Sequence, residues 1–163
     1  MNLLSGAVNV VSTVVAMIFI DRIGRKPLLF WGSCGMTATL GALAICFSQA
    51  VLVDGRLVLP DSIAVAALVL ANLYVFAFGV SWGPCVWVLL GEMFPNRYRA
   101  AGLSVGASIQ WVANFAVTMT FPIFLAGLGL PLSYAIYTFF AAFSIWFVVR
   151  AVRETNGRTL EQM

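Results

Sequence analysis

Gly83-Pro84-Cys85-Val86-Trp87 interrupts an apolar run that ends just before the charged stretch Glu92-Met93-Phe94-Pro95-Asn96-Arg97-Tyr98-Arg99. The run covers about 63–90, which is too long for an ordinary core helix. In a bilayer, irregular backbone is tolerated only where protein buries it or where it lines a cavity. Membrane transporters place their substrate sites at such broken helices. The stretch therefore predicts part of a membrane transporter.

The composition indicates a membrane protein throughout. Hydrophobic residues make up 62% of the 163 residues and charged residues only 9%, whereas a soluble domain carries about a quarter charged residues. The charges cluster between long uncharged runs. Although the isoelectric point is near 9.0, the basic residues are too few and too scattered for a nucleic-acid-binding face. We predict an all-α polytopic membrane protein with a single membrane domain, residues 1–163.

The uncharged runs predict the membrane spans. A helix needs about 20 residues to cross the hydrocarbon core of a bilayer. Five runs approach or exceed this length and contain no Asp, Glu, His, Lys or Arg. The sequence therefore predicts five transmembrane helices, at about 3–20, 28–53, 63–90, 101–125 and 132–149, followed by a tail at 150–163.

The basic residues predict the orientation. Eight of the nine Lys and Arg residues follow the first, third and fifth runs, and only Arg56 lies on the opposite side. The side richer in Lys and Arg is normally cytoplasmic. We therefore expect the N-terminus outside and the C-terminal tail in the cytoplasm. The residues favour a bacterial plasma membrane and do not exclude a eukaryotic one.

Three motifs resemble one transporter family. Asp21-Arg22-Ile23-Gly24-Arg25-Lys26-Pro27-Leu28 resembles the D/E-R-x-G-R-R/K signature of the sugar porters, within the major facilitator superfamily. The Gly-Pro-x-x-Trp segment with Glu92 and Arg99 resembles the family's tenth helix and the turn after it. Glu154-Thr155-Asn156-Gly157-Arg158-Thr159-Leu160-Glu161 resembles the closing P-E-T-K-G-R-T-L-E motif, with Arg153 in place of Pro and Asn156 in place of Lys.

The resemblance covers essentially the whole chain and implies that its spans are helices eight to twelve of a sugar porter. A transporter of this kind needs two halves around a site at the middle of the membrane. We therefore expect the chain to be the C-terminal part of a larger protein, with the missing N-terminal helices as its partner. The alternatives are a truncated, non-transporting membrane fragment, or a major facilitator of another small polar solute.

Charged residues at the predicted cytoplasmic helix ends form one candidate site. The resemblance implies a network of ion pairs that holds these ends together when the transporter opens outward; we call this set the charge latch. The alternative is that the charges only orient the chain, but Asp and Glu hardly affect orientation. The members of the charge latch are Asp21, Arg22, Arg25, Glu92, Arg99, Glu154 and Arg158.

Amide and aromatic residues form the candidate sugar site. Sugar hydroxyls call for amide partners, and Gln110 and Asn114 share one helix face because they are four residues apart. Hydrogen bonds between helices are the alternative role for both. The resemblance implies that Trp87 stacks against the sugar and that Asn9 contacts a hydroxyl. It also implies that the stretch containing Gln110, Trp111 and Asn114 contacts the sugar.

Two further expectations concern motion and coupling. Gly83 and Pro84 weaken the helix and predict a hinge, with a static kink as the alternative. Proton symport needs a titratable group inside the membrane, and the five predicted spans contain no acid or base. Symport therefore stays open against facilitated diffusion, with protons as a candidate coupling ion.

The chemistry needed for an enzyme is missing from the predicted spans. The chain contains no His, so the Ser and Thr residues have no obvious activating base. We therefore predict no enzyme activity, no catalytic residues, no metal site and no cofactor. The sequence favours transport of a monosaccharide or related small sugar by alternating access, as part of a larger porter.

Overall fold

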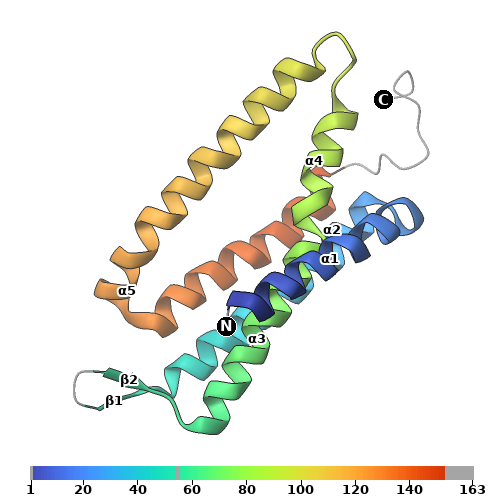
Figure 1. Cartoon of the computed structure of the whole chain (residues 1–163). Helices are drawn as coiled ribbons and strands as arrows, with labels where there is room; N and C mark the ends of the chain where they lie inside the picture. Colours follow the sequence, from blue (N-terminus) through green and yellow to red (C-terminus); the bar gives the residue numbers. More distant parts are fainter. Residues whose placement is uncertain (1, 54–55, 153–163) are drawn as a thin grey trace.

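Helices dominate the structure, because an apolar chain in lipid must satisfy its backbone N–H and C=O groups within each segment. The computed structural model describes residues 2–53 and 56–152. Its helices and strands follow one another along the chain as Figure 1 shows. They are α1 (Asn2–Ile23), α2 (Arg25–Ser48), β1 (Val51–Val53), β2 (Arg56–Val58), α3 (Asp61–Val80), α4 (Trp82–Met93) and α5 (Arg99–Ala151).

The long helix α5 is two helices joined at a sharp bend. Gly129 has φ +78°, a left-handed conformation that glycine adopts without steric cost. We call residues 99–128 the first limb of α5 and residues 130–151 its second limb. The two limbs run in opposite directions (Figure 1). They correspond to the predicted spans 101–125 and 132–149, joined by a short turn.

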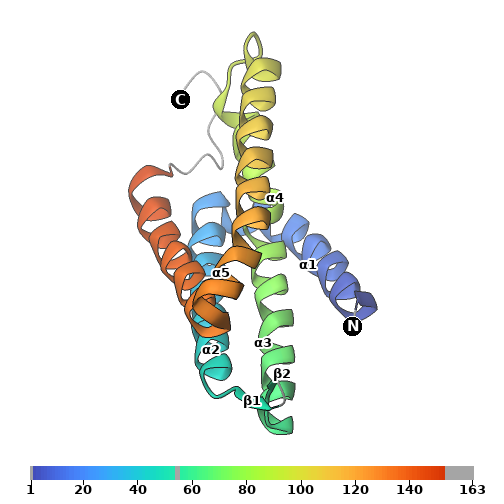
Figure 2. The ribbon, with the colours of Figure 1, turned by 90° about the vertical axis from the view of Figure 1, so that its left-hand side faces the viewer.

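The helices form two layers. In Figure 2, α2 and the second limb of α5 lie on the left, while α3, α4 and the first limb lie beside them with α1 on the outer right. The contacts agree, since α5 packs mainly on α2, and α1 mainly on α3. The three helices that carry the predicted sugar-contact residues, α1, α4 and the first limb of α5, therefore lie on one side of the layer formed by α2 and the second limb.

Three helical segments of the described chain are long and apolar enough to cross a membrane: residues 25–48, 61–93 and 99–151. Residues 5–20 form a shorter apolar helix. The predicted second span was too long at its end. Helix α2 ends at Ser48, and Val51–Val53 instead pairs antiparallel with Arg56–Val58. The β-branched valines favour a strand, and the intervening Asp54-Gly55 is a hairpin signal, although these two residues lie outside the described part.

The predicted third span is broken, as the Gly83-Pro84 pair indicates, but the break lies two residues earlier. Ser81 leaves helical geometry at φ −112° and ψ −86°, whereas Gly83 and Pro84 lie in the first turn of α4. A proline ring clashes with the carbonyl four residues before it and cannot donate to it. For Pro84 that residue is Val80, which is where α3 ends.

The break is packed tightly against α2. Ser81 is completely buried, and a Cβ atom at Gly32 would overlap its side chain. The residues that follow Gly32 and Ser81 are also in contact: Trp82 Nε1 donates a hydrogen bond to Ser33 Oγ across 2.9 Å. On the opposite side of α3, a Cβ atom at Gly79 would overlap Ser12 of α1. Small residues thus allow α1, α2 and α3 to approach closely near the break.

Two buried apolar clusters hold α2 against its neighbours. The first lies toward the α1–α2 turn and is built on Ile20, Leu28, Leu29, Cys85, Leu89 and Val148. The second, built on Met36, Leu40 and Ala141, joins α2 to the second limb of α5, with Tyr74 and Trp82 packed against it. Both clusters include residues of α2, which is therefore the central helix of the described bundle.

Candidate functional site

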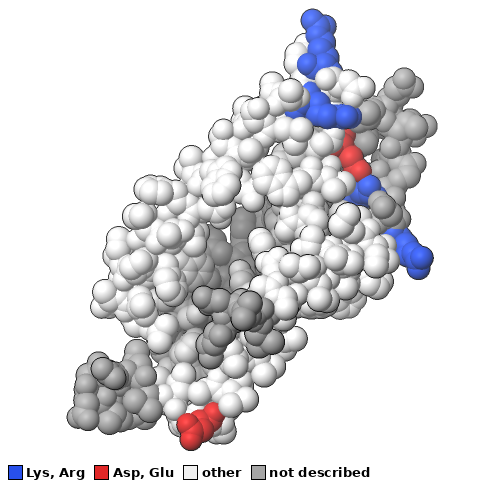
Figure 3. Space-filling view, in the orientation of Figure 1, with Lys and Arg blue, Asp and Glu red and all other residues white. Residues whose placement is uncertain are grey.

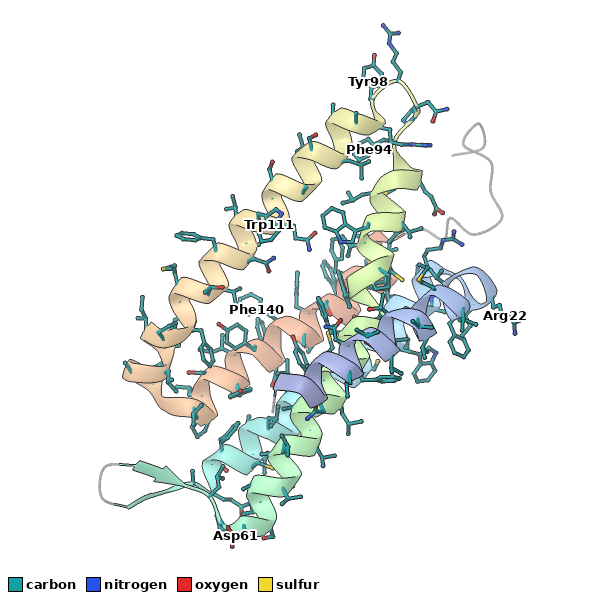
Figure 4. All side chains as sticks on the ribbon, in the orientation of Figure 1. Arg22, Asp61, Phe94, Tyr98, Trp111 and Phe140 are labelled. Atoms are coloured by element: carbon teal, nitrogen blue, oxygen red, sulfur yellow. The ribbon has the colours of Figure 1, made fainter. Side chains whose placement is uncertain are left out.

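The described Lys and Arg side chains gather at one end of the molecule, where α1 turns into α2 and α4 into α5 (Figure 3). We call this the basic end. Asp61 lies at the opposite end (Figures 3 and 4). Gly24, at φ +96°, makes the tight turn from α1 to α2. This distribution has the asymmetry from which the cytoplasmic side was predicted.

Two members of the charge latch form an ion pair. Arg25 Nη2 lies 2.6 Å from Glu92 Oε1, which links the start of α2 to the end of α4. The Arg25 side chain is 11% exposed and that of Glu92 is 30% exposed. Charge-assisted hydrogen bonds are roughly twice as strong as neutral ones, and this pair is partly shielded from solvent. Two residues of the predicted charge latch, Arg25 and Glu92, are therefore in contact in the structure.

The other latch residues are placed less closely or lie outside the description. Arg22 is exposed at the end of α1 (Figure 4). The buried Nε of Arg99 has no hydrogen-bond partner among the described residues. The side chain of Asp21 is not described, and Glu154 and Arg158 lie beyond the described residues. The structure thus places one pair of the predicted network.

A further contact at the basic end was missed by sequence reasoning. Lys26 Nζ donates to the backbone carbonyl of Val149 across 3.0 Å. The last carbonyls of a helix have no intrahelical partner, and a lysine can satisfy one of them. Lys26 directly follows Arg25 in the signature motif, which was the available signal. What the sequence did not reveal is that the end of α5 lies beside the start of α2.

Helix α4 and the first limb of α5 meet closely near the loop that joins them. A Cβ atom at Gly102 would press against Phe94, and one at Gly106 would press against Leu90. Trp87 lies about one turn beyond Leu90, and Gln110 one turn beyond Gly106, in this antiparallel arrangement. Trp87 and Gln110 are therefore at the same depth. The limb diverges from α4 with distance from the loop (Figure 1).

Gln110 carries an unsatisfied buried polar atom. Its Oε1 is buried and has no hydrogen-bond partner among the described residues. Leaving such an acceptor unpaired costs about 1–3 kcal/mol. The interhelical hydrogen bond considered as an alternative role is therefore not made by this oxygen within the described chain. The atom is suited to accept a hydrogen bond from a group outside it.

The aromatic and amide neighbours of Gln110 are open. Trp87 is 43% exposed and Trp111 71% exposed. Trp111 lies midway along the first limb (Figure 4), and Asn114 is also exposed. The described helices therefore leave Trp87, Trp111 and Asn114 partly or largely uncovered.

Asn9 lies apart from this group along the helix axis. Its carbonyl accepts hydrogen bonds from Ser12 and Thr13, while its side chain is exposed. The Asn9 carbonyl faces Gly79, just before the break at Ser81. Trp87 is about two helical turns further toward the basic end. The structure therefore places Trp87 and Gln110 at one depth and Asn9 at another.

A broken helix in an apolar bundle, with basic residues at one end and amides on one side, fits the part of a major facilitator bundle that the sequence motifs predicted. The family is shown by direct comparison: the chain belongs to the sugar (and other) transporter family, whose model matches residues 1–163. The predicted family is therefore confirmed, and the chain is an integral membrane protein.

Among its relatives, the chain is 54% identical to the glucose transport protein of Synechocystis, over 98% of this chain and 34% of the relative. It is 39% identical to the glucose facilitated diffusion protein of Zymomonas mobilis, over 97% of this chain and 32% of the relative. The D-xylose-proton symporter of Escherichia coli is 36% identical, over 97% of this chain and 31% of the relative.

Solved structures of the xylose transporter XylE are also similar. A double-Trp mutant matches with a TM-score of 0.84 and 36% identity, covering 98% of this chain and 32% of that one. The inward open conformation from E. coli matches with a TM-score of 0.81 and 38% identity, covering 97% of this chain and 33% of that one. The chain thus spans about a third of the length of the curated relatives and solved structures that it matches.

Proposed function

We propose that this chain forms part of a sugar porter and contributes one side of its binding site for a monosaccharide or related small sugar. The observation that carries the proposal is the pairing of Trp87 with the unsatisfied Oε1 of Gln110 at one depth. An indole offers a flat apolar surface for a sugar ring, and an amide oxygen accepts a hydroxyl hydrogen bond. A site that places a few polar groups on an apolar wall is typical of small-molecule recognition.

In this proposal, Trp87 and Gln110 are the main contacts. Trp111 and Asn114 extend the same surface along the first limb of α5, and Asn9 contributes from α1 at the depth of the break. The relatives' names support the substrate class, since they include a glucose transport protein and a D-xylose-proton symporter. They include both a symporter and a facilitated diffusion protein, so protons remain a candidate coupling ion.

Two regions carry the proposed conformational change: the break between α3 and α4, where bending occurs, and the basic end, which opens and closes. We propose that the remaining helices of a full-length porter cover the open side of α1, α4 and the first limb. Alternating access then bends α4 relative to α3 near Ser81, Gly83 and Pro84. The charge latch, including the Arg25–Glu92 pair, holds the basic end closed in one state. The basic end faces the cytoplasm of a plasma-membrane protein, with the N-terminus outside.

A chimeric porter tests this function. The third of the E. coli D-xylose-proton symporter that this chain matches is replaced by the chain, and uptake of labelled glucose and xylose is measured in cells lacking their own sugar porters. We expect saturable uptake of at least one sugar. The changes Trp87→Ala and Gln110→Ala should each reduce uptake about tenfold or more, because a recognition site loses an aromatic or hydrogen-bonding partner.

Matched variants separate this site from general damage. Trp146→Ala removes a tryptophan that is exposed on the second limb and should retain uptake within about twofold, given the modest effect of most surface substitutions. Equal loss in Trp146→Ala and Trp87→Ala would argue against the proposed site. The 163-residue chain expressed alone should give no uptake. A chimera that reaches the membrane yet carries neither sugar would support a major facilitator of another solute or a non-transporting fragment.

A further inference from the structure

The hydroxyl group of Tyr137 lies inside the bundle without a partner, as the side-chain oxygen of Gln110 does. Tyr137 belongs to the second limb of α5, and its ring packs against the apolar cluster built on Met36, Leu40 and Ala141. Its hydroxyl oxygen is buried and has no hydrogen-bond partner among the described residues. A phenol hydroxyl can donate one hydrogen bond and accept another, and burial without either carries the cost of desolvation. The atom is therefore suited to bind a group that the described chain does not supply.

Aromatic rings from α2 and from both limbs of α5 meet at Tyr137. The ring centroid of Phe121, on the first limb, lies 6.0 Å from that of Tyr137 and 6.4 Å from that of Tyr134. The Tyr134 ring in turn lies 5.0 Å from that of Phe47 on α2. We call Phe47, Phe121, Tyr134 and Tyr137 the aromatic cluster. It combines flat apolar rings with an unpaired hydroxyl, as the candidate sugar site combines an indole ring with an unpaired amide oxygen.

The aromatic cluster continues the helix face that carries Gln110. Phe121 follows Gln110 by 11 residues, which turn an α-helix by about 1,100°, within about 20° of three full turns. Asn114 and Val117 occupy positions between them on the same face. The 11 residues span about 16 Å along the axis, and they lead toward the bend at Gly129, away from the basic end (Figure 1). One face of the first limb therefore connects the aromatic cluster to the candidate sugar site.

Side chains next to this face are uncovered and uncharged. Asn114 is exposed and Val117 is 49% exposed. Phe140, three residues after Tyr137, lies on the side of the second limb that faces the first limb (Figure 4) and is 60% exposed. Residues 101–149 contain no Asp, Glu, His, Lys or Arg. An ionic ligand would have no counter-charge there, whereas a neutral ligand with several hydroxyl groups needs only hydrogen bonds and apolar contact.

We propose that the aromatic cluster is a second sugar subsite, in which the Tyr137 hydroxyl bonds to a sugar hydroxyl and the Phe121 ring stacks on the sugar ring. The proposal rests on the proposed function, since the ligand is the same sugar. Sugar that enters from the side opposite the basic end reaches this subsite before Gln110. The two contacts act in sequence, because about 16 Å of helix separates them and one sugar ring cannot span it. The hydroxyl is buried in this structure, so the Phe121 ring turns aside as the sugar binds.

Uptake by the chimeric porter tests the proposal. Tyr137→Phe keeps the ring and removes the hydroxyl. We expect the KM for glucose uptake to rise about fivefold, the factor that corresponds to one hydrogen bond of ordinary strength, and the maximal rate to stay unchanged. Competition by glucose analogues that each lack one hydroxyl identifies the contact. The unaltered chimera should prefer glucose about fivefold over one of these analogues, and Tyr137→Phe should not distinguish the two. A role in folding alone would not remove the selectivity at a single hydroxyl.

The matched control is Tyr134→Phe, which removes a hydroxyl from the neighbouring ring of the aromatic cluster. That hydroxyl is not one of the buried unpaired atoms of the described residues, so KM and selectivity should not change. Thermal unfolding of the purified chimera gives a second readout: Tyr137→Phe should unfold at the same or a higher temperature, because no hydrogen bond within the protein is lost. If Tyr137→Phe does not reach the membrane, Phe121→Ala decides, since loss of the stacking ring should raise the KM for glucose and for every analogue.

Three results would overturn the subsite: an unchanged KM in Tyr137→Phe, an equal change in Tyr134→Phe, or a lower unfolding temperature of Tyr137→Phe with unchanged selectivity. The last result would show that another helix of the porter, and not the sugar, bonds to the hydroxyl. Loss of uptake in Trp87→Ala and Gln110→Ala with no effect of Tyr137→Phe would overturn the subsite and leave the proposed function standing. A chimera that carries no sugar would overturn both.

Discussion

The guanidinium of Arg25 donates to the carboxylate of Glu92 across 2.6 Å, joining the first residue of α2 to the next-to-last residue of α4. The two side chains are 67 residues apart in sequence. Helices α2 and α4 run antiparallel here, because α2 begins at the pair and α4 ends there. The ion pair therefore closes the basic end of the α2–α4 interface.

Removing the carboxylate should destabilise the chain. Glu92→Gln takes the negative charge away from a guanidinium that is only 11% exposed. We expect a loss of about 1–3 kcal/mol in the free energy of unfolding, the range for hydrogen bonds to partly buried charged groups. Thermal unfolding in detergent measures it. The double change Arg25→Glu with Glu92→Arg should recover part of the loss, and no recovery would show that the pair itself contributes little.

An added methyl group should disturb the break between α3 and α4. Gly32→Ala places a Cβ atom on the side chain of Ser81, which is fully buried. We expect a destabilisation of about 1–3 kcal/mol, as for other overpacked sites. Gly91→Ala is the control, because nothing lies within 4 Å of its Cβ position. Adding Ser81→Gly to Gly32→Ala should restore stability, and an equal effect of Gly32→Ala and Gly91→Ala would contradict the packing described.

The bend in α5 should be sensitive to its glycine. Gly129→Ala forces an L side chain into φ +78°, which should cost about 1–2 kcal/mol. Gly127→Ala, two residues earlier in the helix with open space around its Cβ position, should be neutral or stabilising because alanine favours helix. Chemical denaturation of the purified variants compares them. If both behave alike, the bend does not depend on the left-handed residue.

Replacing Gln110 should raise the stability of the protein and abolish sugar uptake. Gln110→Leu replaces a buried, unpaired amide oxygen with an apolar group of similar volume, and we expect stability to rise by about 1 kcal/mol. The same change in the chimeric porter should abolish sugar uptake. Asn72→Leu is the matched control: the Asn72 amide is satisfied by Ser5 and by the Leu68 carbonyl, so the change should destabilise. A stable Gln110→Leu chimera with full uptake would remove Gln110 from the proposed site.

Hydropathy and charge in the sequence predicted those structural features that depend on neighbouring residues alone. Uncharged runs predicted the helices, since lipid leaves the backbone no other partner than the helix itself. The two limbs of α5 were predicted as the separate spans 101–125 and 132–149. Arg25 and Glu92 were selected because their motifs lie on the same predicted side of the membrane. The end of α2 was not predicted, because an apolar valine run continues past Ser48 and hydropathy does not distinguish strand from helix there.

Contacts between distant segments were out of reach. The hydrogen bond from Lys26 to Val149 depends on how the second limb of α5 packs against α2, which no spacing in the chain reveals. The position of the break follows from a local rule that the sequence analysis did not apply: the ring of Pro84 clashes with the carbonyl of Val80, so that α3 ends there and Ser81 is non-helical. The amide spacing of Gln110 and Asn114 predicted a shared helix face, yet only the structure shows that the Gln110 oxygen is buried and unsatisfied.

Helix α4 is attached to α2 at two points, by Trp82 to Ser33 near its first residue and by Glu92 to Arg25 near its last. The ties are eight residues apart on α2 and ten on α4, roughly 12 and 15 Å of helix. Two contacts this far apart limit the rotation of α4 relative to α2. If α4 rotates about Ser81, one of these two contacts must break first. The contact that water can reach is the ion pair, since the Glu92 side chain is 30% exposed.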